Sequence, residues 1–318
     1  MTSNPESIRP LIGVDIGGTK IAVAAVHPTG RIVAQCDFPT DAERGFDTAV
    51  RRISEAIDEV TARAASDSGM GTIAGIGIGC AGPVDPLRGL INNPFTLTGW
   101  NRCDIVRPLE RRFEVPVRLE NDADVAALGE CWVGAGMGAS PVVMLTFGTG
   151  VGGAAVVAGQ LVRGVGGEHP ELGHVPVDPQ GPACYCGISG CLESIASGSA
   201  LGEAGKALGL NDAREVFAAA DGGSKAAQSI VDRAVDAACA AAWTIFHTLL
   251  PRRLILGGGM MDTEFERFVA PMRNRISRAT QFTASAVEIS RARLGNTAGI
   301  VGAASLLRPG HETGTGPN

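Results

Sequence analysis

Short apolar runs divided by glycine turns open the chain. Residues 11–26 contain two apolar stretches separated by Gly-Gly-Thr, a pattern that predicts a strand, a glycine turn and a second strand. Residues 31–40 predict a third strand, and 49–69 place apolar side chains at helical spacing before a glycine stop. Residues 73–85 predict another strand, which ends in a glycine–proline loop.

The opening pattern returns later in the chain. Residues 115–134 predict a strand, a polar turn and a helix that begins near Ala123, and 141–164 then repeat the strand, glycine turn and strand. Most of the chain after residue 164 is expected to be helical, with an alanine-rich helix over 224–249 and a buried strand at 252–260. The repeated hairpin indicates two related α/β halves that face each other.

Composition places the chain among ordinary globular proteins, since it has 318 residues of which 45% are hydrophobic and 19% charged. The 44 glycines predict tight turns and close approach of the backbone to a ligand. A net charge of −6 without a basic stripe argues against nucleic acid as a partner. No apolar run or leader pattern predicts a membrane span or secretion, so we expect a soluble, cytoplasmic protein with reduced cysteines.

Three glycine-rich turns are candidate nucleotide contacts. Turns of this kind let backbone amides approach phosphate oxygens, and an aspartate beside one can hold Mg²⁺ through water. For the first turn, the alternative is a tight hairpin around a buried aspartate. The last turn could form a platform for a flat base, and its alternative is an ordinary strand-to-helix turn. The residues are Asp15, Gly17, Gly18, Thr19 and Lys20 in the first turn, Gly148, Thr149 and Gly150 in the second, and Gly257 and Gly258 after the buried strand.

The polar turn at 120–123 has two interpretations. Asp122 stands where a strand is expected to pass into a helix, so it can be the helix N-cap, which position alone favours. It can instead be the general base that accepts the proton of a substrate hydroxyl.

A cysteine cluster is the most specific local pattern. Cys184, Cys186 and Cys191 are closely spaced, and His174 upstream supplies a fourth ligand for tetrahedral zinc. A disulfide or chance clustering would be the alternatives, and a cytoplasmic chain argues against the first. With four protein ligands the site is expected to be structural, and Glu171 and Glu193 flank it as possible acceptors for sugar hydroxyls.

These motifs together resemble the ROK family of sugar kinases and repressors. CYCGISGCLESIASG is similar to the family's cysteine signature, and DIGGTK, CAGPVD, ENDA, LTFGTGVGG, ELGH, LILGGG and GNTAG occur in the family's order between Leu11 and Leu307. The resemblance implies an α/β, actin-like (ribonuclease H-like) two-domain ATPase fold with an interdomain cleft. The expected domains are 1–120, completed by a C-terminal helix at 298–308, and 121–297 with the zinc site, before a disordered tail at 309–318.

The resemblance also assigns roles to residues. It makes Asp122 the catalytic base, and it places the glycine turns around ATP and Mg²⁺. The groups that it implies for sugar binding are Gly82, Asn93, Asn121, Asp122, Glu171, His174 and Glu193. His174 would then bind zinc through one ring nitrogen and approach the sugar with the other.

Some positions depart from the family pattern. Asn92 and Asn93 both stand near the expected sugar asparagine, and His169-Pro170 is closer to a fructokinase-like branch. Asp124 replaces the commoner asparagine or uncharged residue at its position. We therefore expect an ATP-dependent kinase for the 6-hydroxyl of a hexose, with glucose first, N-acetylmannosamine next and fructose third. The alternatives are a sugar-sensing regulator without its DNA-binding domain and a kinase for a non-sugar acceptor. The family implies a homo-oligomer, a dimer or tetramer, and leaves polyphosphate open as a donor.

Overall fold

Two compact units make up the chain in the computed structural model, which describes residues 8–278 and 287–308. The first unit takes its described residues from 1–137, 159–169 and 296–318, and the second from 138–158 and 170–295. The tail expected to be disordered, 309–318, lies outside the described residues. Each unit is built around its own sheet, although the short strand β11 (Gln160–Leu161), which is counted with the second sheet, falls in residues of the first unit.

The first sheet has the order β3-β2-β1-β4-β8. Its strands are β1 (Leu11–Ile16), β2 (Lys20–Val26), β3 (Ile32–Pro39), β4 (Gly75–Cys80) and β8 (Val117–Asn121). β1 and β2 form the expected antiparallel hairpin, whereas β4 runs parallel to both β1 and β8. The predicted strands are therefore confirmed, and the carboxyl ends of β1, β4 and β8 share one edge.

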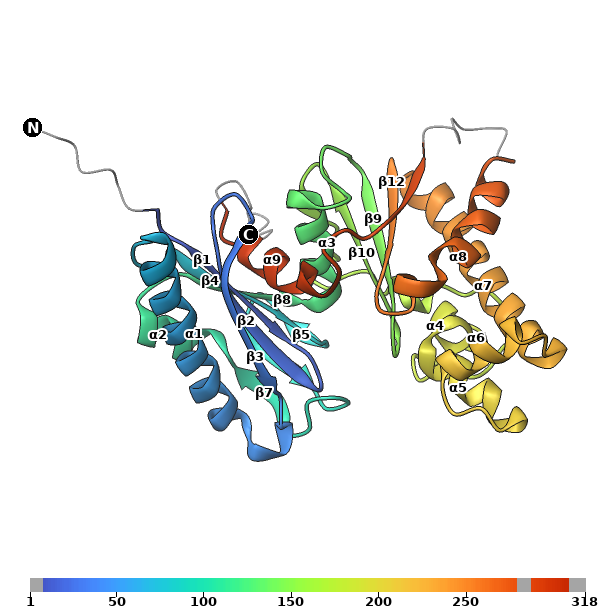
Figure 1. Cartoon of the computed structure of the whole chain (residues 1–318), viewed down its shortest axis with the longest axis horizontal. Helices are drawn as coiled ribbons and strands as arrows, with labels where there is room; N and C mark the ends of the chain where they lie inside the picture. Colours follow the sequence, from blue (N-terminus) through green and yellow to red (C-terminus); the bar gives the residue numbers. More distant parts are fainter. Residues whose placement is uncertain (1–7, 279–286, 309–318) are drawn as a thin grey trace, which may run out of the picture. The chain divides into compact units, whose positions relative to one another are not determined.

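Helices cover both faces of this sheet (Figure 1). Alternate side chains of β1 such as Ile12 and Val14 pack in the core that includes α1 (Phe46–Ser68), whereas Leu11 packs in a smaller core with α9 (Ala298–Ser305). Gly13 of β1 faces α9 closely, because a Cβ there would lie 2.0 Å from the carbonyl oxygen of Ile300. This glycine thus lets α9 lie directly on the backbone of the strand.

The first unit extends beyond the expected boundary at residue 120. The reason is α3 (Asp122–Val133), which packs against α9 and lies in the same unit. Residues 159–169 also belong to this unit, although the chain on either side of them belongs to the second. The remaining elements are η1 (Ala42–Arg44), α2 (Val106–Phe113) and a small sheet of β5 (Val84–Asp85), β6 (Leu90–Asn93) and β7 (Trp100–Asp104).

The second sheet repeats the arrangement of the first. Its order is β11-β10-β9-β12-β13, with β9 and β10 antiparallel and β12 parallel to both β9 and β13. The strands are β9 (Val142–Phe147), β10 (Val151–Val157), β11 (Gln160–Leu161), β12 (Arg253–Gly257) and β13 (Glu288–Arg291). The sequence prediction that one hairpin module is used twice is confirmed.

The second unit carries more helix than the first. The segments are η2 (Leu172–His174), α4 (Leu192–Ala196), α5 (Gly198–Gly205), η3 (Lys206–Leu208), α6 (Ala213–Asp221), α7 (Lys225–Leu249) and α8 (Met261–Ile276). The short helix η5 (Gly295–Thr297) begins at the last residue of the second unit and continues into the first. The alanine-rich helix expected over 224–249 is α7, which begins after the N-cap Ser224. Within 8–278 and 287–308, no helix is both long and apolar enough to cross a membrane.

Candidate functional site

The first glycine turn is firmly anchored in the first unit. The amide of Gly17 donates to the carbonyl oxygen of Lys20 at 2.9 Å, and the hydroxyl of Thr40 donates to the carbonyl oxygen of Gly17 at 2.7 Å. Gly18, Thr19 and Lys20 are nevertheless exposed. The turn is rigid and open, which suits backbone amides that receive a phosphate.

Asp15 lies just before this turn, inside the edge of the sheet. Burial, and then the neighbouring Asp122 carboxylate, raise the pKa of Asp15 to about 6, while Lys20 opposes the shift. Two acidic groups thus lie near one cationic group. A divalent cation at this place would favour the charged form of Asp15, which makes it a suitable Mg²⁺-supporting carboxylate.

Asp122 is not the N-cap of its helix. The cap is Asn121, whose side-chain oxygen accepts the amide of Ala123 at 2.8 Å. The interpretation of Asp122 as the capping residue is therefore wrong, because the neighbouring asparagine takes that role. Asp122 is the first helical residue and is exposed. Gly82 lies close to the side-chain nitrogen (Nδ2) of Asn121. An accessible carboxylate on a fixed strand-to-helix junction has the geometry required of a general base.

Asn93 is occupied by its own loop. Its side-chain nitrogen donates to the carbonyl oxygen of Ala81 at 3.0 Å and to the hydroxyl of Thr96 at 2.7 Å. Its side-chain oxygen accepts the amides of Phe95 and Thr96, and the residue is 1% exposed. Both donors of this amide are used, so we assign Asn93 to shaping the loop rather than to binding a sugar directly.

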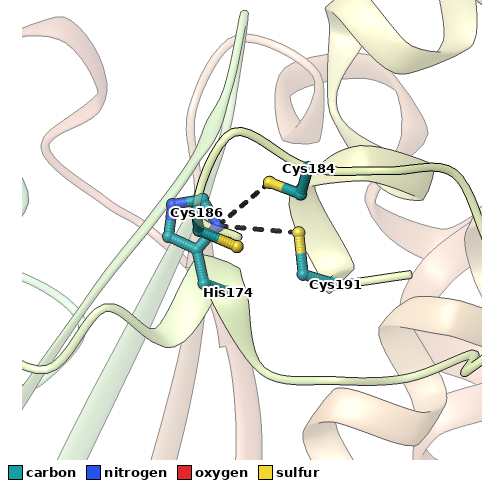
Figure 2. Close-up of side chains that lie close together, drawn as sticks. All are labelled: His174, Cys184, Cys186 and Cys191. Atoms are coloured by element: carbon teal, nitrogen blue, oxygen red, sulfur yellow. Dashed lines mark hydrogen bonds between the residues drawn. The ribbon is translucent and has the colours of Figure 1, made fainter. Parts of the chain in front are cut away.

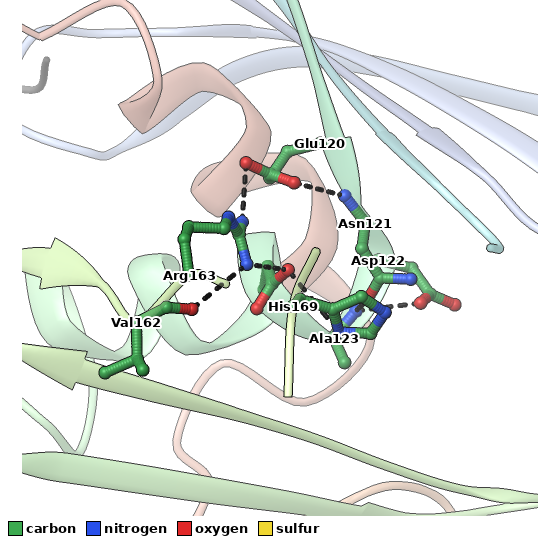
Figure 3. Close-up of polar contacts among 8 residues, drawn as sticks. Glu120, Asn121, Asp122, Ala123, Val162, Arg163 and His169 are labelled. Atoms are coloured by element: carbon green, nitrogen blue, oxygen red, sulfur yellow. Dashed lines mark hydrogen bonds and ion pairs between the residues drawn. The ribbon is translucent and has the colours of Figure 1, made fainter. Parts of the chain in front are cut away.

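A buried charge cluster flanks Asp122, and no sequence motif predicts it (Figure 3). Arg163 pairs with Glu120 at 2.6 Å and with Asp124 at 2.9 Å, and the Nδ1 atom of His169 lies 3.7 Å from Asp124. The side chain of His169 is only 19% exposed, and its ring faces a fully buried carboxylate. Only the fold could reveal this cluster, since its members come from distant parts of the chain.

The four predicted zinc ligands come together in the second unit (Figure 2). Nδ1 of His174 lies 3.6 Å from Sγ of Cys184 and 3.5 Å from Sγ of Cys191, and the ligand atoms of all four residues lie within 4.8 Å of one another. Metal–ligand distances of about 2.0–2.3 Å place the ligand atoms of a tetrahedral zinc roughly 3.5–3.8 Å apart. The Cys₃His set therefore fits zinc in its chemistry, and the two distances from His174 to the cysteines fit it in size.

The second glycine turn is tied to the segment that follows the cysteine cluster. A carboxylate oxygen of Glu193 accepts the amide of Val151 at 2.8 Å, directly after Gly150. The carbonyl oxygens of Gly148 and Thr149 accept amides from the start of α5. The metal-binding segment and the candidate phosphate turn are thus linked by hydrogen bonds within one unit.

Glu171 and His174 lie at the two ends of the short helix η2, which lies against β10. Glu171 precedes η2 and is exposed, whereas His174 ends it. A Cβ on Gly173 would lie 1.8 Å from the carbonyl oxygen of Val151, so only glycine permits this close approach. The ring of Tyr185 meets that of His174 edge to face, with 5.1 Å between centroids.

A cavity of about 1050 Å³ opens beside the second glycine turn. Gly148 and Thr149 line one part of it, and Gly259 and Met260 line another. Gly257 and Gly258, the two glycines expected to contact the nucleotide, are not among the lining residues. The residues that sequence reasoning missed come from the α5–α6 region and the start of α8, and include Glu203, Lys206, Asn211, Ala218, Asp262 and Glu264. They carry no recognisable motif, because helices and loops of ordinary composition supply them.

Known proteins match this chain along most of its length. The model of the ROK family matches residues 11–309. The chain belongs to the ROK family. A glucokinase of Thermotoga maritima is 36% identical over 94% of this chain and 97% of its own, and an N-acetylmannosamine kinase of Escherichia coli is 31% identical over 93% and 98%.

A solved structure agrees with these relatives. A ROK glucokinase from Streptomyces griseus, in complex with glucose and AMPPNP, superimposes with a TM-score of 0.74 and is 32% identical over 93% of this chain and 98% of its own. The fold is therefore the actin-like ATPase fold of the ROK sugar kinases, as the motifs predicted.

Proposed function

We propose that this ROK protein is an ATP-dependent hexose kinase that phosphorylates the 6-hydroxyl of glucose. The observation that carries the proposal is Asp122, an exposed carboxylate on a rigid junction beside Asn121, with Asp15 and an open glycine turn in the same unit. Relatives named glucokinase support the reaction class, among them the Thermotoga maritima protein, which is 36% identical to this chain.

The reaction is a direct phosphoryl transfer. Asp122 accepts the proton of the sugar hydroxyl as that oxygen bonds to the γ-phosphorus of ATP, and the bond between this phosphorus and the bridging oxygen breaks to release ADP. Mg²⁺ bound with ATP would neutralise charge on the phosphates, and Asp15 is the group that would hold it through water. The backbone amides of the first glycine turn, with Thr19 and Lys20, orient the phosphates.

The second unit supplies the nucleotide pocket in this proposal. The 1050 Å³ cavity is large enough for a nucleoside, and it begins at Gly148 and Thr149, where a phosphate would lie. Phe217, Ala218 and Met260 offer apolar surface to a base, and the polar groups around them offer hydrogen bonds to a base and ribose. Gly257 and Gly258 do not line the cavity; in this proposal they form the turn that leads to the lining residues Gly259 and Met260.

Sugar hydroxyls are assigned to groups in each unit. In the first unit these are Asn121 and Asp122, with Gly82 beside them; in the second they are Glu171, His174 and Glu193. Carboxylates and imidazole nitrogens suit a polyol, because they accept or donate hydrogen bonds in fixed directions. Asn93 acts on this set only through the loop that it holds.

Zinc has a structural role in the proposal. The four ligands leave no open position for water or substrate, so the metal would fix the fold of residues 174–191. Because Glu193 follows Cys191 closely and also bonds to the amide of Val151, an ordered metal site holds a proposed sugar ligand in place.

Glucose is proposed ahead of N-acetylmannosamine and fructose. The Streptomyces griseus relative was crystallised with glucose, and the relative named N-acetylmannosamine kinase is the less similar at 31% identity. The regulator alternative is weaker, because a sensor without turnover has no need for an exposed carboxylate held like Asp122.

Product analysis tests the proposal. The purified protein is incubated with ATP, Mg²⁺ and glucose, and the phosphorus NMR spectrum is followed. We expect glucose 6-phosphate and ADP in equal amounts from the wild type. In Asp122→Ala we expect turnover to fall roughly 10²–10⁴-fold, while calorimetry still detects glucose binding. ATP hydrolysis without sugar phosphate, or full turnover by the variant, would contradict the assignment.

A further inference from the structure

One guanidinium group holds both sides of the junction that presents Asp122 (Figure 3). Arg163 pairs with Glu120 at the end of β8 and with Asp124 in the first turn of α3. Glu120 continues the chain of contacts, because its other carboxylate oxygen accepts the amide of Asn121 at 3.0 Å. The strand end and the helix start are therefore fastened to the same side chain.

The loop that carries Arg163 is built to place it there. The amide of Gly164 donates to the carbonyl oxygen of Glu168 at 2.8 Å, and the carboxylate of Glu168 accepts the amide of Gly166 at 3.0 Å. This closed loop brings Arg163 and His169 to its base, where both face Asp124.

The charges of the cluster explain why Arg163 is needed. The side chain of Asp124 is fully buried, and that of Glu120 is 5% exposed. Two buried carboxylates that lie around one guanidinium repel each other and lose hydration, so each requires a cation or a donor. Arginine serves two carboxylates at once because its planar group offers several donors in fixed directions, which a lysine ammonium does not.

We propose that Arg163 is a positioning residue for the base Asp122, and that Asp124, the departure from the family's commoner asparagine or uncharged residue, is its second anchor. Arg163 touches no substrate in this proposal. It fixes the angle between β8 and α3, and hence the place of the Asp122 carboxylate on the first residue of that helix. The inference rests on the proposed function, since it assumes that Asp122 is the base.

The expected effect is on turnover rather than on binding. A misplacement of a catalytic group by about 1 Å costs roughly 100-fold in rate. Arg163→Lys keeps the charge but loses the two-sided geometry, so we expect kcat to fall about 10–100-fold while KM for glucose and for ATP changes by less than about threefold.

Loss of folding must be separated from loss of positioning. The triple variant Glu120→Gln, Arg163→Met, Asp124→Asn removes every charge of the pairs while it preserves side-chain size, so it leaves no unpaired buried charge. We expect its melting temperature to stay near that of the wild type and its kcat to remain as low as that of Arg163→Lys. Asp124→Asn alone keeps the pair with Glu120 and should lose less activity than Arg163→Lys.

The experiment measures kcat, both KM values and the melting temperature of these variants and of a control. Arg112→Lys is the control, because Arg112 pairs with Asp58 on the half-exposed surface of the same unit. The control should behave like the wild type. Wild-type kcat in Arg163→Lys or in the triple variant, or a loss no greater than the loss of folded protein, would overturn the inference. An inactive wild type would instead overturn the proposed function.

Discussion

Single side chains decide the chemistry that the first unit can perform. Asn121 caps α3, which leaves the next carboxylate, Asp122, exposed and without a capping role. Asp124, two residues further along, is buried and paired with Arg163. Three neighbouring polar residues thus have three different environments, which differ in burial and hydrogen bonding.

The pH dependence of stability should reveal the buried carboxylate. Burial raises the pKa of Asp124 to about 7, against the opposing effect of Arg163 and with a further rise from Glu120. An acid whose pKa is raised by folding contributes stability at low pH that is lost as the pH rises through the folded-state pKa. Between about pH 4 and pH 7 this group therefore weakens the native state.

The substitution Asp124→Asn removes the titrating carboxyl group, and with it the loss of stability as the pH rises. We expect the melting temperature of the variant, relative to the wild type, to be higher at pH 8 than at pH 5 by at least about 2 °C. Thermal melts of both proteins across this range give the comparison. A difference that is constant with pH, or that changes in the opposite direction, would show that Asp124 is ionised throughout.

Helices, strands and loops position these side chains. The sequence predicted these elements better than it predicted which of them contact one another. Apolar runs broken by glycine turns predicted both hairpins, helical spacing predicted α1, and alanine-rich composition predicted α7, because these signals are local. The cavity lining from α5 and α6 and the pairing of Arg163 with Asp124 depend on segments far apart in the chain. Local patterns carry no information on such contacts, and the same reason explains why α3 lies in the first unit with α9.

The cavity of the second unit should bind the nucleotide. Ala218 is an exposed residue that lines it, so Ala218→Trp would fill space that a nucleoside needs. We expect KM for ATP to rise about tenfold or more, which corresponds to about 1.4 kcal/mol, with KM for glucose unchanged. Steady-state kinetics with each substrate varied provide the measurement.

Ala204→Trp is the matched control for this substitution. Ala204 is exposed on α5 but does not line the cavity. A similar rise in KM for ATP in both variants, or no rise in either, would place the nucleotide elsewhere.

The cysteine cluster should hold one zinc per chain. In Cys186→Ser the exposed ligand is replaced by a weaker one, so we expect bound zinc to fall, the melting temperature to drop and KM for glucose to rise. Elemental analysis, melts and kinetics report these three effects. The control variant Cys36→Ser, which changes a cysteine outside the cluster, should keep the full zinc content of the wild type. A Cys186→Ser protein with full zinc content and unchanged kinetics would count against the structural role.

The whole molecule combines two sheets of the same order, each with a glycine turn in its antiparallel hairpin. One unit carries the proposed base and the other carries the proposed nucleotide pocket and the cysteine cluster. The expected boundary at residue 120 placed Asp122 in the same domain as the cysteine cluster, so the placement of Asp122 in the first unit comes from the fold and not from the family motifs. They did not name the sugar, since the groups that bind hydroxyls are shared by kinases for several hexoses.

The most direct measurement is a coupled assay of kcat/KM with glucose, N-acetylmannosamine, fructose, mannose and N-acetylglucosamine, with ATP and Mg²⁺ in excess. We expect glucose to give the highest kcat/KM, and Asp122→Ala to give no turnover with any sugar above roughly 1% of the wild-type rate. A higher kcat/KM for N-acetylmannosamine would overturn the choice of sugar. Absence of turnover with every hexose would contradict the assignment of this protein as a hexose kinase.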